Sequence, residues 1–190
     1  MVLVVWMWLP ALGLLAGHGE AQSCRPELRG IVENLARGRP AFQSSTLQDN
    51  FRGVAKKAVD GNCRGDWYKD YTCSHTQLET DPLWYVDLGS EHAISAVVVK
   101  NREDSCGERL KGAEIRVGDS VQNHGKDNVL CGTITDGSLG SISTIFCHGK
   151  IGRYVTISIP GRPEYLTLCE VEVYGTKLCL SILKAGQGQG

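Results

Sequence analysis

Short runs of alternating apolar and polar residues, separated by turn-forming residues, most constrain how this 190-residue chain folds. A repeat of two is the repeat of a strand with one buried face. The alternation occurs in four segments: 82–89, 112–120, 154–160 and 167–175. Residues 93–101 are denser in β-branched residues, which predicts a strand buried on both faces. No convincing helical stripe occurs between residues 30 and 175. The pattern therefore predicts an all-β sandwich or barrel.

The ends of the chain differ from this central part. Residues 1–17 are apolar almost throughout, and "GEA" up to Ala21 resembles a cleavage site, so residues 1–21 are typical of a secretory signal peptide. A membrane anchor is the alternative, although the uncharged stretch is near the lower length limit for spanning and contains Pro10. We expect a polar lead at 22–33, one domain at 34–175 and a disordered Gly/Gln-containing tail at 176–190.

The chain has eight cysteines, all of them after the predicted signal peptide. A secreted chain meets an oxidising environment, so most of these thiols are expected to be paired. Spacing alone does not decide between the 105 pairings that eight cysteines allow. The net charge is −1, which does not indicate a basic surface, so we expect no nucleic-acid partner.

The decapeptide 101–110, NREDSCGERL, follows a predicted strand and places Arg102 and Arg109 in one rim loop. Two nearby guanidiniums repel unless carboxylates such as Asp104 and Glu108 orient them or a ligand accepts their hydrogens. Such a ligand carries several oxygens, as a carboxylate, a phosphate or a sugar does. The plain alternative is a solvated loop in which the arginines pair only with carboxylates of the same loop.

His75 in "CSH" joins the two arginines of "REDSCGER", and the surrounding blocks extend the match. These blocks are "AVDGN", "WYVDL", "GAEI", "IGRYV" and "LCEVEVYG". From about residue 34 to residue 175 the chain resembles the F-type lectins, or fucolectins. The resemblance implies a jelly-roll β-sandwich, related to discoidin-like domains, whose loops at one end bind L-fucose.

On this resemblance, His75, Arg102 and Arg109 donate hydrogen bonds to the sugar, and we expect Asp104 to orient the arginines. Trp67 and Tyr68 stand near the place of a family aromatic pair and are candidates for an apolar contact. Ordinary loop packing is the alternative for both. The family usually has two adjacent cysteines where this chain has Ser105 and Cys106, so a vicinal disulfide cannot form here.

The resemblance also implies a structural Ca²⁺ ion held by six residues. Calcium prefers six to eight oxygen ligands. Side-chain oxygens would come from Asp60, Asn62 and Glu170, and main-chain carbonyls from Lys57, Thr72 and Cys169. An Asp-Gly turn and a surface glutamate are the alternative.

Two disulfides follow from the resemblance, Cys73–Cys169 and Cys131–Cys147. Four cysteines remain outside this framework: Cys24, Cys63, Cys106 and Cys179. Cys24 and Cys179 flank the domain, so one interpretation pairs them, and another links subunits through any of the four.

The predicted function is that of a secreted, calcium-containing lectin for terminal L-fucose, in glycan recognition or innate defence. Its partners would be fucosylated glycans, and the protein would contact membranes only through their glycoconjugates. Weak single-sugar binding favours a homo-oligomer, because avidity then adds to affinity. An enzyme is not expected, since no G-x-S-x-G, H-E-x-x-H or P-loop is present. A discoidin-like adhesion or membrane-binding module without fucose binding is the alternative, and "RGD" at 64–66 is its weak signal.

Overall fold

The computed structural model describes residues 24–25, 33–48 and 52–178. The predicted signal peptide, Cys179 and most of the lead and tail lie outside these residues. Within the described ranges, no helix is both long enough and apolar enough to cross a bilayer.

The described residues form strands joined by loops, with four short helical turns. The strands are β1 Ala41–Gln43, β2 Ser74–His75, β3 Glu79–Thr80, β4 Leu83–Lys100, β5 Glu114–Gly118, β6 Val129–Thr133, β7 Ile142–Ser158, β8 Pro163–Glu164, β9 Thr167–Leu168 and β10 Glu170–Lys177. The helical turns are α1 Trp67–Asp70 and the 3₁₀ turns η2 Ala55–Val59, η3 Gly107–Leu110 and η4 Gln122–Gly125. The all-β prediction is confirmed.

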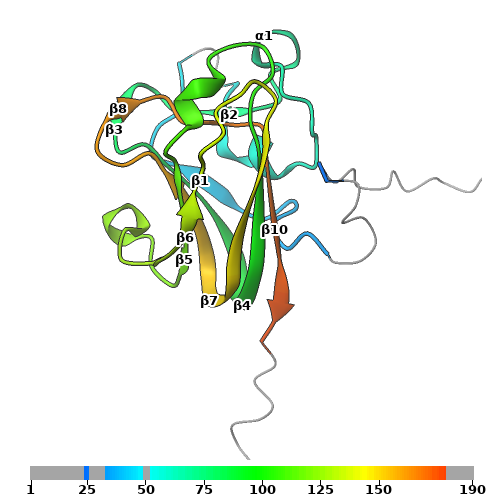
Figure 1. Ribbon diagram of the computed structural model, residues 1–190, viewed down its shortest axis with the longest axis vertical. Coiled ribbons are helices and arrows are strands. Elements are labelled where there is room, and N and C mark those ends of the chain that lie inside the picture. The colour runs from blue at the N-terminus through cyan, green and yellow to red at the C-terminus, as the bar shows by residue number, and fades with distance from the viewer. Residues whose placement is uncertain (1–23, 26–32, 49–51, 179–190) are drawn as a thin grey trace, which may run out of the picture.

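The main sheet has the strand order β1-β4-β7-β5-β6, and β10 pairs with residues 92–100 of β4, beyond the stretch that pairs with β1. Both long strands bend at one end of the molecule (Figure 1). The β4–β7 register breaks between Asp87 and His92, so each long strand contributes to two layers. Gly152 lies at this bend of β7, where a Cβ atom would come within 2.5 Å of the Gly118 nitrogen. Only glycine fits such a close backbone approach.

The core lies between the two layers and contains the predicted alternating residues. One buried cluster joins both halves of β4 to β5, β7 and β10: Trp84, Val86, Leu88, Ile94, Val97, Val99, Ile115, Val117, Val155, Ile157, Val171 and Val173. Each is at most 1% exposed. Burying such a side chain contributes about 1.5–3 kcal/mol, so this cluster supplies most of the driving force for folding.

Two boundaries differ from the predictions. Segments 82–89 and 93–101 are one continuous strand, because the chain bends at Gly89 (φ +83°) without leaving the sheet. The bend is tolerated because glycine adopts positive φ readily. The last strand also runs to Lys177, two residues into the predicted tail.

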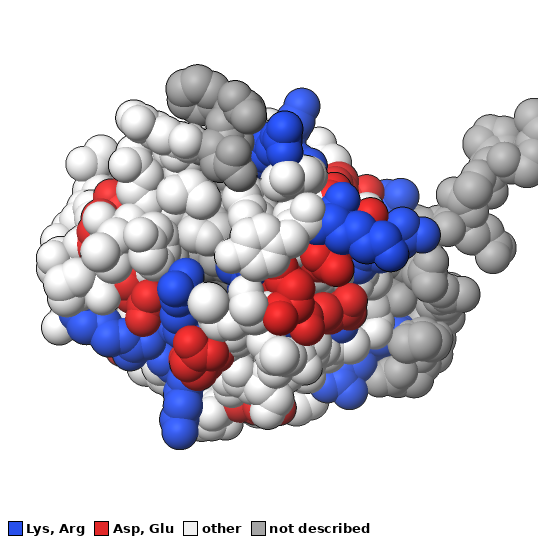
Figure 2. Space-filling model, turned by 90° about the horizontal axis from the view of Figure 1, so that it is seen from above, with Lys and Arg blue, Asp and Glu red and all other residues white. Residues whose placement is uncertain are grey.

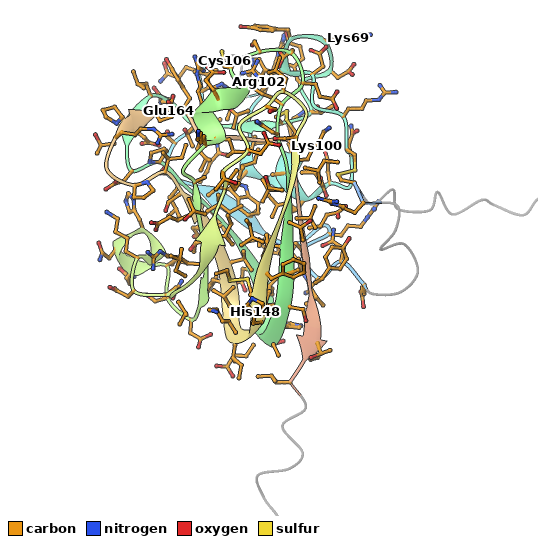
Figure 3. The ribbon with its side chains drawn as sticks, viewed as in Figure 1. Lys69, Lys100, Arg102, Cys106, His148 and Glu164 are labelled. Carbon is orange, nitrogen blue, oxygen red and sulfur yellow. A yellow bond between two sulfur atoms is a disulfide. The ribbon has the colours of Figure 1, made fainter. Side chains whose placement is uncertain are left out.

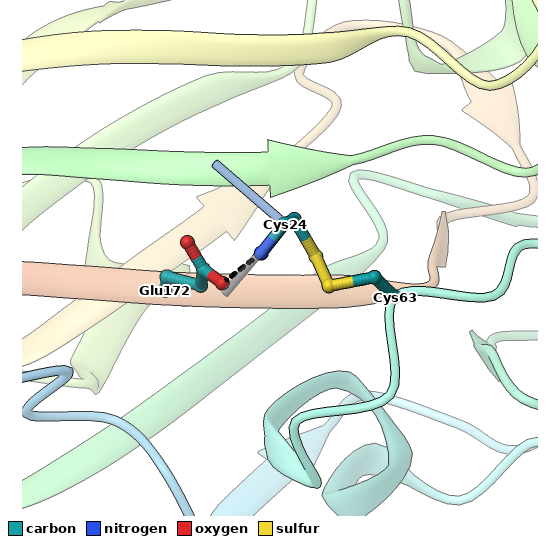
Figure 4. A group of neighbouring side chains, drawn as sticks. All are labelled: Cys24, Cys63 and Glu172. Atoms are coloured by element: carbon teal, nitrogen blue, oxygen red, sulfur yellow. Dashed lines mark hydrogen bonds between the residues drawn. A yellow bond between two sulfur atoms is a disulfide. The ribbon is translucent and has the colours of Figure 1, made fainter. Parts of the chain in front are cut away.

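The outer face of β10 is covered, which the alternating pattern did not indicate. Glu172 is 1% exposed and accepts hydrogen bonds from the Cys24 backbone nitrogen at 2.6 Å and the Tyr174 hydroxyl at 2.8 Å. Cys24 is joined by a disulfide to Cys63, beside Glu172 (Figure 4). This pairing corrects the interpretation that joined Cys24 to Cys179. The start of the predicted lead is therefore tied to the domain.

Candidate functional site

The candidate site lies at the end of the sandwich opposite the bends of β4 and β7. Arg102 and Cys106 are at this end, whereas His148 lies at the other (Figure 3). Seen from above, this end gathers acidic side chains near its centre and basic ones on both sides (Figure 2). The decapeptide 101–110 begins directly after β4, as predicted, and includes η3.

Asn101 fixes the start of this loop from inside. It is 1% exposed, and its amide nitrogen donates to the carbonyls of Gly107 at 2.9 Å and Ser138 at 3.0 Å. Its side-chain oxygen accepts from the Arg102 backbone nitrogen at 2.9 Å. A buried amide with all these groups satisfied holds the loop in one conformation. Arg102 therefore starts from a rigid backbone.

The Arg102 side chain is oriented by Asp104, as predicted. Its Nε and Nη2 atoms donate to the two Asp104 oxygens, each at 2.8 Å, and Nη2 also donates to the Ser105 hydroxyl at 3.0 Å. Burial alone would raise the pKa of Asp104, but the hydrogen bonds and charge of Arg102 hold it below its usual range. The alternative of solvated arginines is wrong for Arg102, which is 2% exposed.

Arg109 is held more loosely. Its Nε atom lies 3.7 Å from a Glu164 oxygen, and its guanidinium carbon lies 4.8 Å from the centre of the Tyr165 ring. None of the described residues accepts a hydrogen bond from this guanidinium. Such a group, beside an aromatic face and without a hydrogen-bonded partner, is available to donate to a ligand.

His75 lies in β2, which pairs with β9, and is 3% exposed. Its Nδ1 atom lies 2.7 Å from the Thr76 carbonyl oxygen. A carbonyl only accepts, so Nδ1 carries the proton and the neutral ring presents a lone pair at Nε2. Burial lowers the pKa of His75 and keeps the ring neutral. The predicted donor role therefore requires the imidazolium, whereas the neutral ring accepts.

Gly53 makes room for this histidine. A Cβ atom at Gly53 would lie 2.8 Å from the His75 Cβ atom, and the Gly53 carbonyl accepts from the His75 backbone nitrogen at 2.9 Å. The rings of Trp67 and Tyr165 flank the imidazole, with centroids 4.9 and 5.4 Å away. The ring is therefore held in place on several sides.

Trp67 and Tyr68 come from α1, whose first turn is capped by Asp66 through the Lys69 nitrogen at 2.8 Å. Trp67 is 3% exposed and Tyr68 is 68% exposed. The Tyr68 backbone nitrogen donates to Asp104 at 3.2 Å, which ties α1 to the arginine loop. The two predicted aromatics thus lie at different depths of one site.

These side chains enclose one pocket of about 280 Å³. Its lining consists of Leu47, Trp67, Tyr68, His75, Arg102, Cys106, Arg109 and Tyr165. Of the predicted residues, all but Asp104 line the pocket, and Asp104 acts through Arg102. Leu47, Tyr165 and the neighbouring Glu164 were not predicted, since their segments carry only turn and strand signals.

The predicted disulfides Cys73–Cys169 and Cys131–Cys147 are both present. The first joins the segment before His75 to the residue that precedes β10. Cys106 is the one cysteine of the described ranges without a disulfide.

The six predicted calcium ligands lie around η2, the following loop and the start of β10. Glu170 is 0% exposed, and its oxygens accept from the Gly61 nitrogen at 3.1 and 3.2 Å. Burial, together with the charge of Asp60, raises the pKa of Glu170 to about 9. In the described ranges, no cationic nitrogen lies within ion-pair distance of Glu170. The alternative of a surface glutamate is therefore wrong.

The other members of the set make contacts within the same region. Asp60 accepts from the Asn62 nitrogen at 2.9 Å, and the Asn62 side-chain oxygen accepts from the Arg64 nitrogen at 3.1 Å. The Thr72 hydroxyl donates to the Arg64 carbonyl at 2.7 Å. The Lys57 ammonium donates to the Tyr71 carbonyl, which joins η2 to the segment before Thr72.

Comparisons with known proteins identify relatives of this fold. A family model described as a NedA-like, galactose-binding domain matches residues 57–157. Fucolectin-2 of Anguilla japonica is 44% identical over 147 residues, covering 75% of this chain and 79% of that protein.

Two solved structures share the fold. A fucolectin from striped bass (Morone saxatilis) serum is 48% identical with a TM-score of 0.72, over 77% of this chain and 48% of that chain. The lectin domain of lectinolysin, solved with Lewis B antigen, is 31% identical with a TM-score of 0.63, over 76% of this chain and 98% of that one. These relatives are lectins and not enzymes, and together with the jelly-roll fold and the His75–Arg102–Arg109 site they show that the chain belongs to the F-type lectin (fucolectin) family.

Proposed function

We propose that this protein is a secreted, calcium-containing lectin that binds terminal L-fucose in the pocket between Arg102 and Arg109. The observation that carries the proposal is that three side chains with unpartnered polar atoms line one pocket whose walls include aromatic rings. Within the described ranges, Arg109 and Nη1 of Arg102 have no hydrogen-bond acceptor, and Nε2 of His75 has no donor. The glycan partners, secretion and a role in innate defence belong to this proposal.

A neutral sugar suits this set. Asp104 already balances the charge of Arg102, so this guanidinium needs no anionic ligand. A sugar hydroxyl donates to His75 Nε2 and accepts from a guanidinium at the same time, which uses both kinds of site. Hydrogen bonds to a charged group contribute about 1.5–3 kcal/mol each. The binding energy would then come from few, well-placed contacts.

The apolar side of fucose would contact the pocket wall without a vicinal disulfide. Trp67, Tyr165 and Leu47 provide the apolar surface, and Cys106 lines the same pocket. The affinity for one sugar should be modest, since a monosaccharide makes few contacts. A homo-oligomer presenting several sites would raise the avidity.

The buried carboxylate of Glu170 supports a calcium site in the same proposal. A carboxylate in a low-dielectric place without a cationic partner is stabilised by a bound cation. Asp60, Asn62, Glu170 and the carbonyls of Lys57, Thr72 and Cys169 would hold the ion. Bound there, calcium would supply positive charge that joins the η2 loop to β10. This would stabilise the base of α1, which carries Trp67 and Tyr68.

Calorimetric titration of L-fucose into the mature protein tests the proposal. L-galactose is a sharp control, because it differs from L-fucose only by a hydroxyl on C6. We expect L-fucose to bind and L-galactose to bind at least several-fold more weakly, since the added hydroxyl would face the apolar wall. Equal affinity for both would contradict the assigned apolar contact. No binding of fucose or fucosylated glycans, with binding to anionic vesicles, would favour the discoidin-like alternative.

A further inference from the structure

Cys106 is a free thiol in the wall of the sugar pocket. It is partly exposed and begins η3 with a left-handed backbone (φ +54°). The six other described cysteines are in disulfides. A thiol that is accessible and lies beside cationic groups can act as a nucleophile in disulfide exchange, whereas a buried structural thiol is inert.

The surroundings of Cys106 favour an anionic reagent. Arg102 and Arg109 line the same pocket as Cys106. Within the described ranges, the guanidinium of Arg109 has no hydrogen-bond acceptor. An incoming carboxylate would find these donors within the same cavity of about 280 Å³.

A second, independent feature shows that the pocket is built to receive a ligand. His75 is 3% exposed, and the only hydrogen bond of its ring is the one from Nδ1 to Thr76. The rest of the ring lines the pocket with Nε2 unpartnered. The lone pair of Nε2 is therefore open to a group that enters the pocket.

We propose that Cys106 is a thiol–disulfide exchange site through which a small carboxylate-bearing disulfide closes the sugar pocket. The Cys106 thiolate attacks one sulfur of the reagent and forms a mixed disulfide with that half. The bond between the two reagent sulfurs breaks, and the other half leaves as a thiolate that takes up the proton lost by Cys106. No further oxidant is needed. The carboxylate of the attached half then lies against Arg109.

The consequence for binding rests on the proposed function, because both ligands use the same pocket. An attached group fills the space that a sugar would occupy, so the oxidised form would lose sugar binding and a reducing agent would restore it. A disulfide between two copies is less favoured, because Cys106 lines a recess that a small molecule enters more easily than a second chain does.

Exchange rates of the native protein with three matched disulfides test the proposal. Dithiodipropionate, 2-hydroxyethyl disulfide and cystamine end in a carboxylate, a hydroxyl and an ammonium on chains of similar length. Intact-mass measurement should show one more added group on the native protein than on Cys106→Ser. For this group, dithiodipropionate should react about fivefold faster than cystamine, which is the size of one exposed ion pair. Arg109→Gln should remove this preference, whereas Arg153→Gln at the far end should keep it.

The outcomes separate the two proposals. No reaction at Cys106, equal rates for the three reagents, or a disulfide-linked dimer as the main product would overturn the exchange site. If exchange follows the expected order but the reduced protein binds no fucose, the exchange site stands and the sugar assignment fails. If the reduced protein binds fucose and the modified protein binds it equally well, the exchange does not close the pocket and this inference is overturned.

Discussion

Arg102 and Asp104 form a two-pronged ion pair in which both nitrogen–oxygen distances are 2.8 Å. The Arg102 side chain is 3% exposed and that of Asp104 is 10% exposed. The far end of the sandwich carries a pair of the same form, Arg153–Asp87, at 2.7 and 2.6 Å, in which the arginine side chain is 44% exposed. The two pairs differ mainly in burial.

Asp104→Asn should therefore destabilise the protein and weaken sugar binding together. Removing one member of a buried pair leaves an uncompensated charge and costs about 3–5 kcal/mol. Asp87→Asn is the matched control, and its cost should stay below about 1 kcal/mol because water solvates Arg153. Urea unfolding of both variants measures the difference. Similar losses would mean that burial of the Arg102–Asp104 pair has no energetic consequence.

Arg109→Ala should remove most fucose binding without destabilising the fold. The lost charged hydrogen bond corresponds to about 1.5–3 kcal/mol, roughly ten- to more than a hundredfold in affinity. Its partly exposed pairing with Glu164 at 3.7 Å contributes little to stability. Arg109→Lys should also fail, since an ammonium lacks the guanidinium fork. Calorimetric titration of fucose measures the affinity of each Arg109 variant, and Arg153→Ala is the control. An unchanged affinity of Arg109→Ala would mean that Arg109 is only a surface charge.

Fucose affinity should fall in acid through His75. Burial lowers the pKa of this ring, so it is neutral at pH 7 with an acceptor at Nε2. Protonation turns that acceptor into a donor and adds a third cation to the pocket. Affinity should be constant from pH 8 to about 6.5 and fall once the pH drops below the lowered pKa. The same decline in His75→Gln would point to another group, and His148→Gln should behave as the parent does.

Sequence reasoning identified the core and most of the pocket because both depend on local signals. The alternation through Trp84, Val86 and Leu88 requires only a repeat of two, and all three are buried. Arg102 and Arg109 stand out as two cations in one loop, whereas His75 was recognised only through the resemblance to the F-type lectins. Glu164 and Tyr165 were missed, since the contact of Arg109 with them joins segments that only the folded chain brings together.

Part of one long strand was also not predicted, and the reason is similar. The first half of β7, from Ile142 to about residue 152, lacks regular alternation and contains positive-φ residues at His148 and Gly149. It is a strand because β4 supplies its hydrogen-bond partners, which is a tertiary effect. The pairing of Cys24 with Cys63 likewise depends on where the lead crosses β10, and no local pattern encodes that position.

Calcium should stabilise the protein more strongly as the pH rises, and Glu170 provides the reason. Without the ion, burial and Asp60 raise the pKa of Glu170 from 4.5 to about 9, so the native state favours the protonated carboxyl. Stability from that proton is complete below the unfolded pKa and is lost as the pH rises towards 9. In EDTA the melting temperature should therefore fall across this window. Calcium binds the ionised carboxylate, so its stabilising effect should grow over the same window.

Thermal unfolding in calcium and in EDTA at pH 5, 7 and 9 measures both trends. Glu170→Gln should abolish the calcium response, whereas Glu172→Gln, on the same strand, should keep it even if the protein is less stable. A melting temperature that calcium does not change at any of these pH values would rule out the ion at Glu170, and the buried carboxyl would then simply stay protonated.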